Sequence, residues 1–387
     1  MVSSNPHFEA TTLQKISALL IPCFAYVAVL GIPITFTGII DTFSVSTATA
    51  TIATTTEISC IALASLFVSL ALSYFNPRSA FILGVLFAGL GQLGTILSPD
   101  FTTAVISRGI AGLGEGLCIG IGFASLAQIA GGTRLLGYSA GISAAVTLTA
   151  FLVVPKAHDQ IGPLAIFWML LIGYAALLPL AFKLPSKKIE KLAAEITGSA
   201  LNLRGVCFFV LCLLSSMGAN TLWLYFEQAG ENAHLDFAQI GMVGSVSMLG
   251  CIFVPAAANF IFSKVQNIVP LVVVCLCMAV TSHLFVVPNS TVFVCVAITM
   301  SFLYVFLLAY ARMYSSSFDS SGRTTAAASG ADTLGMVVGP MIVAVTLNLD
   351  TDFSPLGDYG ILMQILCIIP ATILIARKSN KGALPSI

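Results

Sequence analysis

Five ionisable side chains lie inside long apolar stretches of the chain: Glu57, Arg108, Glu115, Glu227 and Asp332. Placing such a residue inside a membrane costs at least a few kcal/mol, so these positions usually mark solute pathways or proton relays. Carboxyl groups in that setting can carry protons, and an arginine can pair with a carboxylate or recognise an anion. The chemistry that these residues predict is proton transfer and ion recognition within a bilayer.

Glu57 is the first candidate for a proton-coupling residue. It follows the hydroxyl-rich run Ala53-Thr-Thr-Thr56 and lies about ten residues, or ~15 Å, into its apolar stretch. A carboxyl group in a low-dielectric environment holds its proton more tightly than one in water. The alternative is a permanently protonated acid that only hydrogen-bonds across helices.

Arg108 and Glu115 are seven residues apart, which places them on one face of a helix and about 10 Å apart along its axis. The glycines between and after them let a neighbouring backbone approach closely; these are Gly112, Gly114 and Gly116. Arg108 lies too deep to reach the surface comfortably and needs a carboxylate partner or a wet cavity. We interpret Arg108 as substrate-binding, and Glu115 as substrate-binding or proton-coupling. The alternative is a structural ion pair that joins this helix to a neighbour.

Asp332 follows a run of small residues, Ala326–Ala331, about 12 Å from the inner end of its stretch. It is a further candidate for proton coupling, on the second-half wall of a cavity. Capping of the helix start and pairing with Arg323 are the alternatives.

Four residues near the outer ends of two apolar stretches complete the candidate set. Asp41 and Glu227 occupy corresponding positions and are candidate gate residues, or acids at a solvated loop edge. Trp223 and Tyr225 are candidates for binding an aromatic solute. Aromatic residues at that depth are more often interfacial anchors, which is the alternative.

The elements that must hold these residues are membrane helices. The chain has 387 residues, of which 58% are hydrophobic and 8% charged, and its mean hydropathy is +1.01, whereas soluble domains carry about 25% charged residues. A spanning helix needs roughly 20 apolar residues. Twelve apolar runs of that order cover about 16–40, 47–74, 79–98, 102–129, 135–155, 163–182, 204–229, 238–261, 269–288, 291–313, 325–347 and 358–376. They do not alternate as barrel strands do, so an all-α membrane protein with twelve transmembrane helices is predicted.

The distribution of charge predicts the orientation. With the N-terminus in the cytoplasm, most basic residues face inward, namely Lys15, Arg78, Arg134, Lys183, Lys187, Lys188, Lys191, Arg204, Lys264, Arg312, Arg323, Arg377, Lys378 and Lys381. This predicts a multi-pass protein of the cell inner membrane with both termini cytoplasmic. The formal net charge is zero, so the protein is not expected to have a positive electrostatic field that attracts nucleic acid. The cysteines fall in apolar runs without metal-site spacing, so neither a metal nor a cofactor is expected.

The two halves of the chain resemble each other. A shift of about 186 residues carries Asp41 onto Glu227 and Arg78 close to Lys264. We therefore predict six-helix bundles over residues 1–183 and 204–387, joined by a cytoplasmic linker over 184–203. Repeated halves of this kind are typical of transporters that move as two rigid bodies.

The chain resembles the major facilitator superfamily over its whole length in span count, loop pattern and central linker. The segment Arg108-Gly-Ile-Ala-Gly-Leu-Gly-Glu-Gly116 is similar to the superfamily's R-x-x-x-G-x-G-x-G signature, and Phe318-Asp-Ser-Ser-Gly-Arg323 with Gly335-Met-Val-Val-Gly-Pro340 resembles bacterial members. The resemblance implies that Arg108 faces a central cavity. The family's loop between spans two and three is reduced here to Asn76-Pro-Arg78, and the fifth span lacks the Gly-Pro motif of drug antiporters.

The function that these patterns favour is secondary active transport of a small organic solute by alternating access, coupled to protons, by a monomer. An uncoupled facilitator and a drug or metabolite efflux antiporter of the same fold are the alternatives. A channel or an intramembrane enzyme is disfavoured, because the chain has neither a filter motif nor an HExxH motif.

Overall fold

The computed structural model describes residues 10–72, 76–184, 203–319, 321–346 and 354–381, and these parts are almost entirely helical. The first half contains α1 (Thr12–Ala25), α2 (Val27–Leu30), α3 (Ile32–Phe43), α4 (Thr47–Ala71), α5 (Pro77–Ile96), α6 (Phe101–Gln128), α7 (Gly132–Ile161) and α8 (Ala165–Ala181). The second half contains α10 (Leu203–Leu224), α11 (Phe226–Asn232), α12 (Phe237–Cys251), α13 (Val254–Lys264), α14 (Val269–Phe285), α15 (Ser290–Phe318), α16 (Arg323–Thr346), α17 (Ser354–Leu366) and α18 (Ile368–Lys381).

These helices form twelve membrane spans. Ten segments in the described residues are long and apolar enough to cross a bilayer, and α8 and α14 are apolar helices of 17 residues each. Several spans consist of two or three helices in series, such as α1–α3, α12–α13 and α17–α18. The all-α fold with twelve transmembrane helices is therefore confirmed. Most of the predicted linker, residues 185–202, lies outside the described residues.

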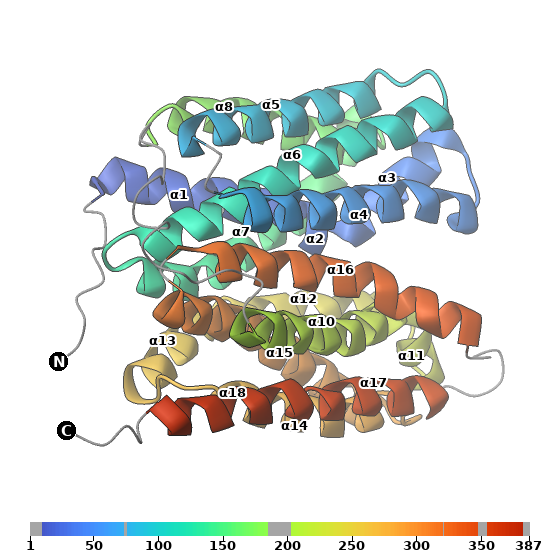
Figure 1. The fold of residues 1–387 in the computed structure, drawn as a ribbon. Coiled ribbons are helices and arrows are strands. Elements are labelled where there is room, and N and C mark those ends of the chain that lie inside the picture. The colour runs from blue at the N-terminus through green and yellow to red at the C-terminus, as the bar shows by residue number, and fades with distance from the viewer. Residues whose placement is uncertain (1–9, 73–75, 185–202, 320, 347–353, 382–387) are drawn as a thin grey trace.

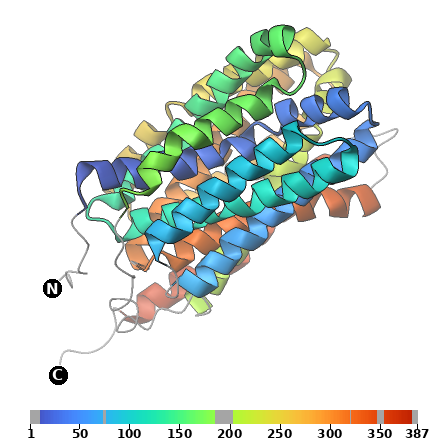
Figure 2. The same cartoon turned by 90° about the horizontal axis from the view of Figure 1, so that it is seen from above.

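The helices of each half lie together and run lengthwise through the molecule. Figure 1 shows α1–α8 on one side and α10–α18 on the other, and Figure 2 shows the same lengthwise run from above. Helix α1 begins and α18 ends at the same end of the molecule, which we call the terminal end. The opposite end, at the α3–α4 and α14–α15 turns, is the far end.

Acidic and amide side chains fix the starts of three helices at the far end. Asp100 accepts a hydrogen bond from the Thr103 backbone N–H (2.9 Å), and Asp236 accepts one from the Gln239 N–H (2.8 Å). Asn289 caps α15 in the same way. Such caps each stabilise a helix by about 1 kcal/mol, so far-end acids of this kind serve helix capping.

The first span is interrupted where it passes the middle of the molecule. Pro22 lies inside α1, and Pro33 lies at the start of α3. Proline removes a backbone donor and bends a helix. Tyr26 lies at the junction of α1 and α2 that results, and Gly31 at the junction of α2 and α3. The breaks position Tyr26 between the two halves of the protein.

Glycines on α6 bring its backbone against α4. A Cβ atom added at Gly112 would lie 2.3 Å from the carbonyl oxygen of Glu57, a distance that a real Cβ does not adopt. Gly116 approaches the carbonyl of Ile61 as closely. The close approach that the glycine spacing predicts is confirmed. It fixes the register in which residues of α4 face residues of α6.

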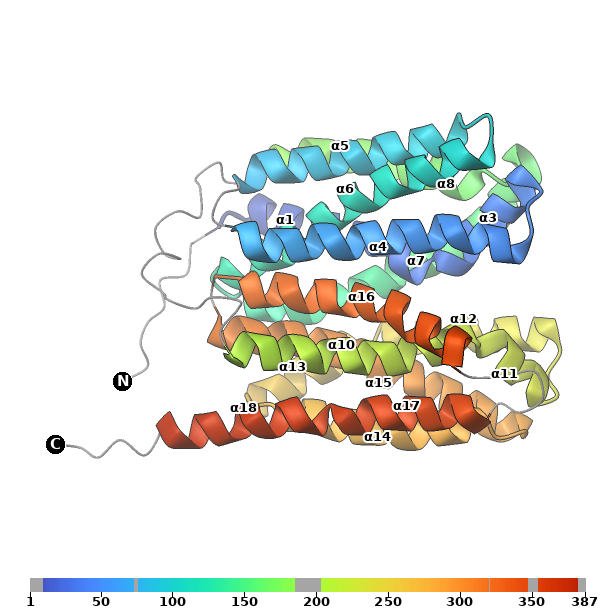
Figure 3. The ribbon, with the colours of Figure 1, turned by 45° about the vertical axis from the view of Figure 1, so that its right-hand side comes forward.

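Contacts between the halves are formed mainly by α4 and α6 with α16, and by α7 with α12, α13 and α15. Figures 1 and 3 both show α4 and α16 close together near the terminal end and further apart at the far end. At the terminal end, the Ser69 hydroxyl donates to the Arg323 carbonyl (2.8 Å), and the Gln128 amide donates to the Ser321 carbonyl (2.5 Å). The halves are therefore joined by hydrogen bonds at the terminal end.

The sequence predicts that this span ends at residue 313, with Arg312 at its inward-facing edge. The prediction is wrong, because α15 continues to Phe318 and the Arg312 side chain is only 3% exposed. The polar residues that end the apolar run do not end the helix, because Ser315 and Ser316 donate to the carbonyls of Arg312 and Met313 one turn back. Arg312 is an intrahelical, buried cation.

Candidate functional site

A buried ion pair joins α4 and α6 within the first half. The Arg108 guanidinium donates to both carboxylate oxygens of Glu57, with its Nε 3.0 Å from Oε2 and its Nη2 on Oε1. Its Nη1 donates to the Gln92 side-chain oxygen on α5 (2.7 Å), and its Cζ lies 5.1 Å from the Phe167 ring centroid on α8. Neither Arg108 nor Glu57 is more than 2% exposed. This bidentate geometry is the strong form of an arginine–carboxylate pair.

Glu115 belongs to the same hydrogen-bonded group. The Gln92 amide donates to its Oε1 (3.0 Å), and the Tyr174 hydroxyl on α8 donates to the same oxygen (3.3 Å). The other oxygen, Oε2, is buried and has no hydrogen-bond partner. We call Glu57, Gln92, Arg108, Glu115 and Tyr174 the enclosed cluster. All of its members lie on α4, α5, α6 and α8, so it is held within one half of the molecule.

A second buried polar group joins the two halves. Asp332 on α16 is 1% exposed and accepts hydrogen bonds from two tyrosines. The Tyr26 hydroxyl, at the α1–α2 junction, donates to Oδ2, and the Tyr304 hydroxyl on α15 donates to Oδ1 (2.5 Å). Tyr304 in turn accepts from the Asn220 amide on α10 (2.7 Å). The hydrogen bond from Tyr26 to Asp332 therefore crosses from the first half to the second.

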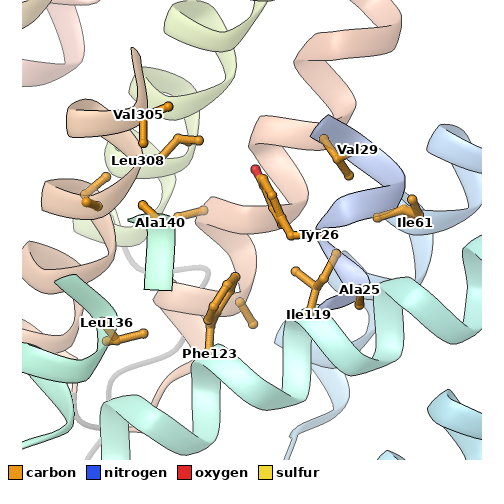
Figure 4. Close-up of a cluster of buried hydrophobic side chains, with 14 of the residues drawn as sticks. Ala25, Tyr26, Val29, Ile61, Ile119, Phe123, Leu136, Ala140, Val305 and Leu308 are labelled. Atoms are coloured by element: carbon orange, nitrogen blue, oxygen red, sulfur yellow. The ribbon is translucent and has the colours of Figure 1, made fainter. Parts of the chain in front are cut away.

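Arg312 lies beside the same tyrosine. Its Cζ is 4.8 Å from the ring centroid of Tyr26 and 4.0 Å from that of Phe123 on α6. One guanidinium nitrogen, Nη1, donates to the Ser139 hydroxyl on α7 (3.2 Å), and the other, Nη2, is buried without a partner. Figure 4 shows Tyr26 and Phe123 projecting into the apolar cluster that Val305 of α15 also enters. We call Tyr26, Tyr304, Arg312 and Asp332 the interface cluster.

The interface cluster lies at the depth of a bilayer core. Asp332 is nine residues from the start of α16 and Tyr26 fourteen from the start of α1, or about 14 and 21 Å at 1.5 Å per residue. A hydrocarbon core is about 30 Å thick. Charged groups at this depth, on the surface between two halves, can bind a solute and exchange protons with it.

The structure brings three predicted site residues together and separates the others from them. Glu57, Arg108 and Glu115 meet in the enclosed cluster, whereas Asp332 lies in the interface cluster and bonds to tyrosines. Asp41 is an exposed residue of α3.

Two aromatic candidates lie further along α10 toward the far end. The rings of Trp223 and Phe226 pack at a tilt of 46°, with centroids 4.8 Å apart, and Phe226 also contacts Phe285 and Phe293. Tyr225 lies between α10 and α11, half-buried. The side chain of Glu227 lies outside the described residues.

Sequence reasoning missed three members of the interface cluster. The charge pattern places Arg312 at the inward-facing edge of a span, and Tyr26 and Tyr304 lie within predicted apolar spans. A signal was present for Tyr26, because it lies between Pro22 and Pro33 in the first span. Within the described residues, no group of three His, Cys, Asp or Glu side chains is arranged to hold a metal ion.

Comparisons with known proteins agree with this architecture. Among solved structures, a bacterial homologue of the iron transporter ferroportin, in an outward-facing state, is similar with a TM-score of 0.71 at 13% identity, over 94% of this chain and 98% of that one. The human organic anion transporter TETRAN has a TM-score of 0.70 at 13% identity, over 94% and 100%. The xylose transporter XylE from E. coli has 0.67 at 15% identity, over 92% and 96%.

At these identities the likeness concerns the fold. No curated protein sequence matches the chain closely enough to count as a relative. The sequence model of the Major Facilitator Superfamily, in contrast, matches residues 18–340. This match covers most of the chain, and the fold of the chain is similar to that of the transporters named above. The chain therefore belongs to the Major Facilitator Superfamily.

Proposed function

We propose that this protein is a proton-coupled secondary transporter that moves a small organic solute by alternating access. Its two halves, residues 1–183 and 204–387, would rock about the interface cluster, with the linker over 184–203 between them. The observation that carries this proposal is the hydrogen bond from Tyr26 to Asp332. It joins the halves through a buried acid at mid-membrane depth, so that protonation and movement of the halves act on the same contact.

We propose one orientation of the protein in the membrane and one conformational state, open toward the outside. We propose that the terminal end is cytoplasmic, as the basic residues predict, in the cell inner membrane. The terminal end is closed by the contacts of Ser69 and Gln128 with the α15–α16 turn. At the far end, α3 packs mainly on α4 and α8, and α11 on α12, each within its own half. This pattern is that of a state open toward the outside.

We propose Asp332 as the principal proton carrier. Its hydrogen bonds involve both halves, so they change when the halves move, whereas those of Glu57 stay within the first half. Glu115 is the second candidate, because the enclosed cluster holds two acids and one base and one of its carboxyl oxygens has no partner. A surplus buried acid is more stable with a proton than as an unpaired charge. Asp41 and Glu227 remain candidate gate residues at the far end, and Trp223 and Tyr225 remain candidates for binding the solute.

The experiment that tests the proposal measures solute-induced proton movement in proteoliposomes. The purified monomer is reconstituted with a pH dye and challenged with organic acids, amines, sugars and aromatic compounds. We expect one compound class to move protons through the wild-type protein. Asp332→Asn should abolish this proton signal while counterflow of the same solute continues.

Two further variants make the result specific. Tyr26→Phe removes the hydroxyl that crosses the halves and should weaken coupling without abolishing flux. Asp358→Asn removes an exposed acid near the start of α17 and should behave like wild type. Solute flux without proton movement in the wild-type protein would contradict coupling and leave a facilitator. Absence of flux for every compound would contradict transport.

A further inference from the structure

The Arg312 side chain is a buried positive charge without an ion-pair partner. It is 3% exposed, its nearest polar contact is the Ser139 hydroxyl, and its Nη2 has no hydrogen-bond partner. Among the described residues the one salt bridge is that of Arg108 with Glu57. A buried charge of this kind is unfavourable unless a counter-ion joins it. We infer that Arg312 is the binding site for the carboxylate group of an organic anion that this protein carries, an inference that rests on the proposed transport function.

The side chains around Arg312 favour a monovalent carboxylate with an apolar body. A guanidinium presents its N–H groups as a planar fork that matches the two oxygens of a carboxylate. In the described part of the chain, Arg312 is the one cation that acts on Asp332 across Tyr26, and a single positive charge suits a solute with a single negative charge. The rings of Phe123 and Tyr26 lie within 5 Å of the Arg312 Cζ. They form apolar walls for the rest of such a solute.

The second buried arginine of the chain supplies the contrast. Arg108 donates three hydrogen bonds, two of them to a carboxylate, and its position is therefore satisfied by the protein itself. Arg312 has the same side chain at comparable burial but donates to a single hydroxyl. The carboxylate that Arg108 has in Glu57 is what the Arg312 site lacks.

Asp332 couples this anion to a proton. Its carboxylate attracts Arg312 electrostatically across Tyr26 but is not within ion-pair distance. The other titratable groups that act on Asp332 are Tyr304 on α15 and Cys212 on α10. Among its described side chains, the neighbouring helix α4 presents no titratable group here, because it contacts Gly330 of α16 through the apolar side chain of Leu66. An anion on Arg312 would leave two negative charges beside one positive charge, and one proton bound by Asp332 from solution restores neutrality. One proton and one monovalent anion then move together, without net charge.

Thermal stability in detergent tests the anion site. Benzoate, benzamide and benzylamine share one ring and differ in charge, and inorganic phosphate provides a different anion. We expect benzoate alone to raise the wild-type Tm, by roughly 3 °C at a hundredfold excess over its Kd. It should not raise that of Arg312→Met. Arg134→Met removes an exposed arginine of α7 and should retain the benzoate response.

The ligand-free variants provide a second measurement that does not depend on the probe. Without ligand, Arg312→Met should have a Tm close to that of the wild type, because Arg312 forms no direct ion pair with another described residue and Asp332 can bind a proton from solution once the arginine charge is removed. Arg108→Met should lower the Tm, because it leaves Glu57 unpaired. A fall for Arg312→Met as large as for Arg108→Met would assign Arg312 a structural role and overturn the inference.

The remaining outcomes separate this inference from the proposed function. Stabilisation by benzamide, benzylamine or phosphate, or by no compound, overturns the carboxylate assignment. Uptake of the neutral or cationic compound in proteoliposomes would retain transport and overturn the anion site. Benzoate binding that Arg312→Met abolishes, without uptake of benzoate, would retain the anion site and refute transport. Electroneutral uptake of benzoate that exceeds the uptake by protein-free liposomes, is lost in Arg312→Met and is unaffected by a valinomycin-clamped potential supports both.

Discussion

The enclosed cluster makes a specific prediction about Glu57→Gln. This substitution keeps the shape of the side chain but removes the charge that faces two nitrogens of Arg108. Removing one partner of a buried ion pair destabilises a protein by about 3–5 kcal/mol, mainly because the other charge remains unpaired. We therefore expect the unfolding free energy to fall by about 3 kcal/mol, the lower end of this range.

The lower end is expected because a second acid is within reach through Gln92. Arg108 Nη1 lies 2.7 Å from the Gln92 oxygen, and the Gln92 nitrogen lies 3.0 Å from Glu115. When Glu57 is neutral, an ionised Glu115 can balance Arg108 across this amide. Glu115→Gln alone should change stability little, whereas Glu57→Gln with Glu115→Gln should lose about 1–3 kcal/mol more than the sum of the single variants.

The assay is SDS-induced unfolding in mixed micelles, followed by circular dichroism, with a double-mutant cycle over Glu57 and Glu115. Adding Arg108→Met to Glu57→Gln should recover most of the loss, because no unpaired charge is left. A Glu57→Gln protein as stable as wild type, with its solute-driven proton movement abolished, would refute this reasoning. Glu57 would then be a proton carrier, and its pairing with Arg108 would have no measurable structural effect.

Two glycines give further predictions. Gly322→Ala should weaken closure of the terminal end, because Gly322 has φ +78° and an added Cβ would lie 2.4 Å from the Ala124 carbonyl oxygen of α6. Maleimide should then label a cysteine introduced at the α15–α16 turn several-fold faster. An unchanged labelling rate would contradict this prediction. Gly112→Ala should destabilise the fold by about 1–3 kcal/mol, because its Cβ would lie 2.3 Å from the Glu57 carbonyl oxygen. Gly250→Ala is the control, because its Cβ would have no atom within 4 Å. Equal thermal stabilities of these two variants would refute the close packing of α4 and α6.

The sequence predicts the spans and the need of Arg108 for a charged partner for related reasons. Apolar length alone identifies twelve helices, and the spacing of Arg108, Glu115 and the glycines on α6 identifies a helix face that needs a charged partner. Glu57 is the partner because it lies at a similar depth on a neighbouring helix. The sequence does not predict that this pair is closed off within the first half, because facing direction depends on how α4, α5 and α8 pack around α6.

The interface cluster could not be predicted from local pattern. The Tyr26–Asp332 bond joins residues 306 positions apart, and no spacing rule connects them. Arg312 was misplaced for a local reason, since serine hydroxyls that end an apolar run can bond to the preceding turn and let the helix continue. Polar residues at a predicted span end are therefore weak indicators of a loop when they are serines.

The two clusters differ in how they respond when the halves move. All partners in the enclosed cluster lie on helices of one half, so its hydrogen bonds persist through such a movement. The Tyr26–Asp332 bond joins the halves and must break or rearrange. A hydrogen bond to a charged group contributes about 1.5–3 kcal/mol and one to a neutral group about 0.5–1.5 kcal/mol. Protonation of Asp332 should therefore weaken this contact by ~1 kcal/mol, which shifts the ratio of closed to open interface by about fivefold. A proton at this one residue is therefore sufficient to bias the exchange between states.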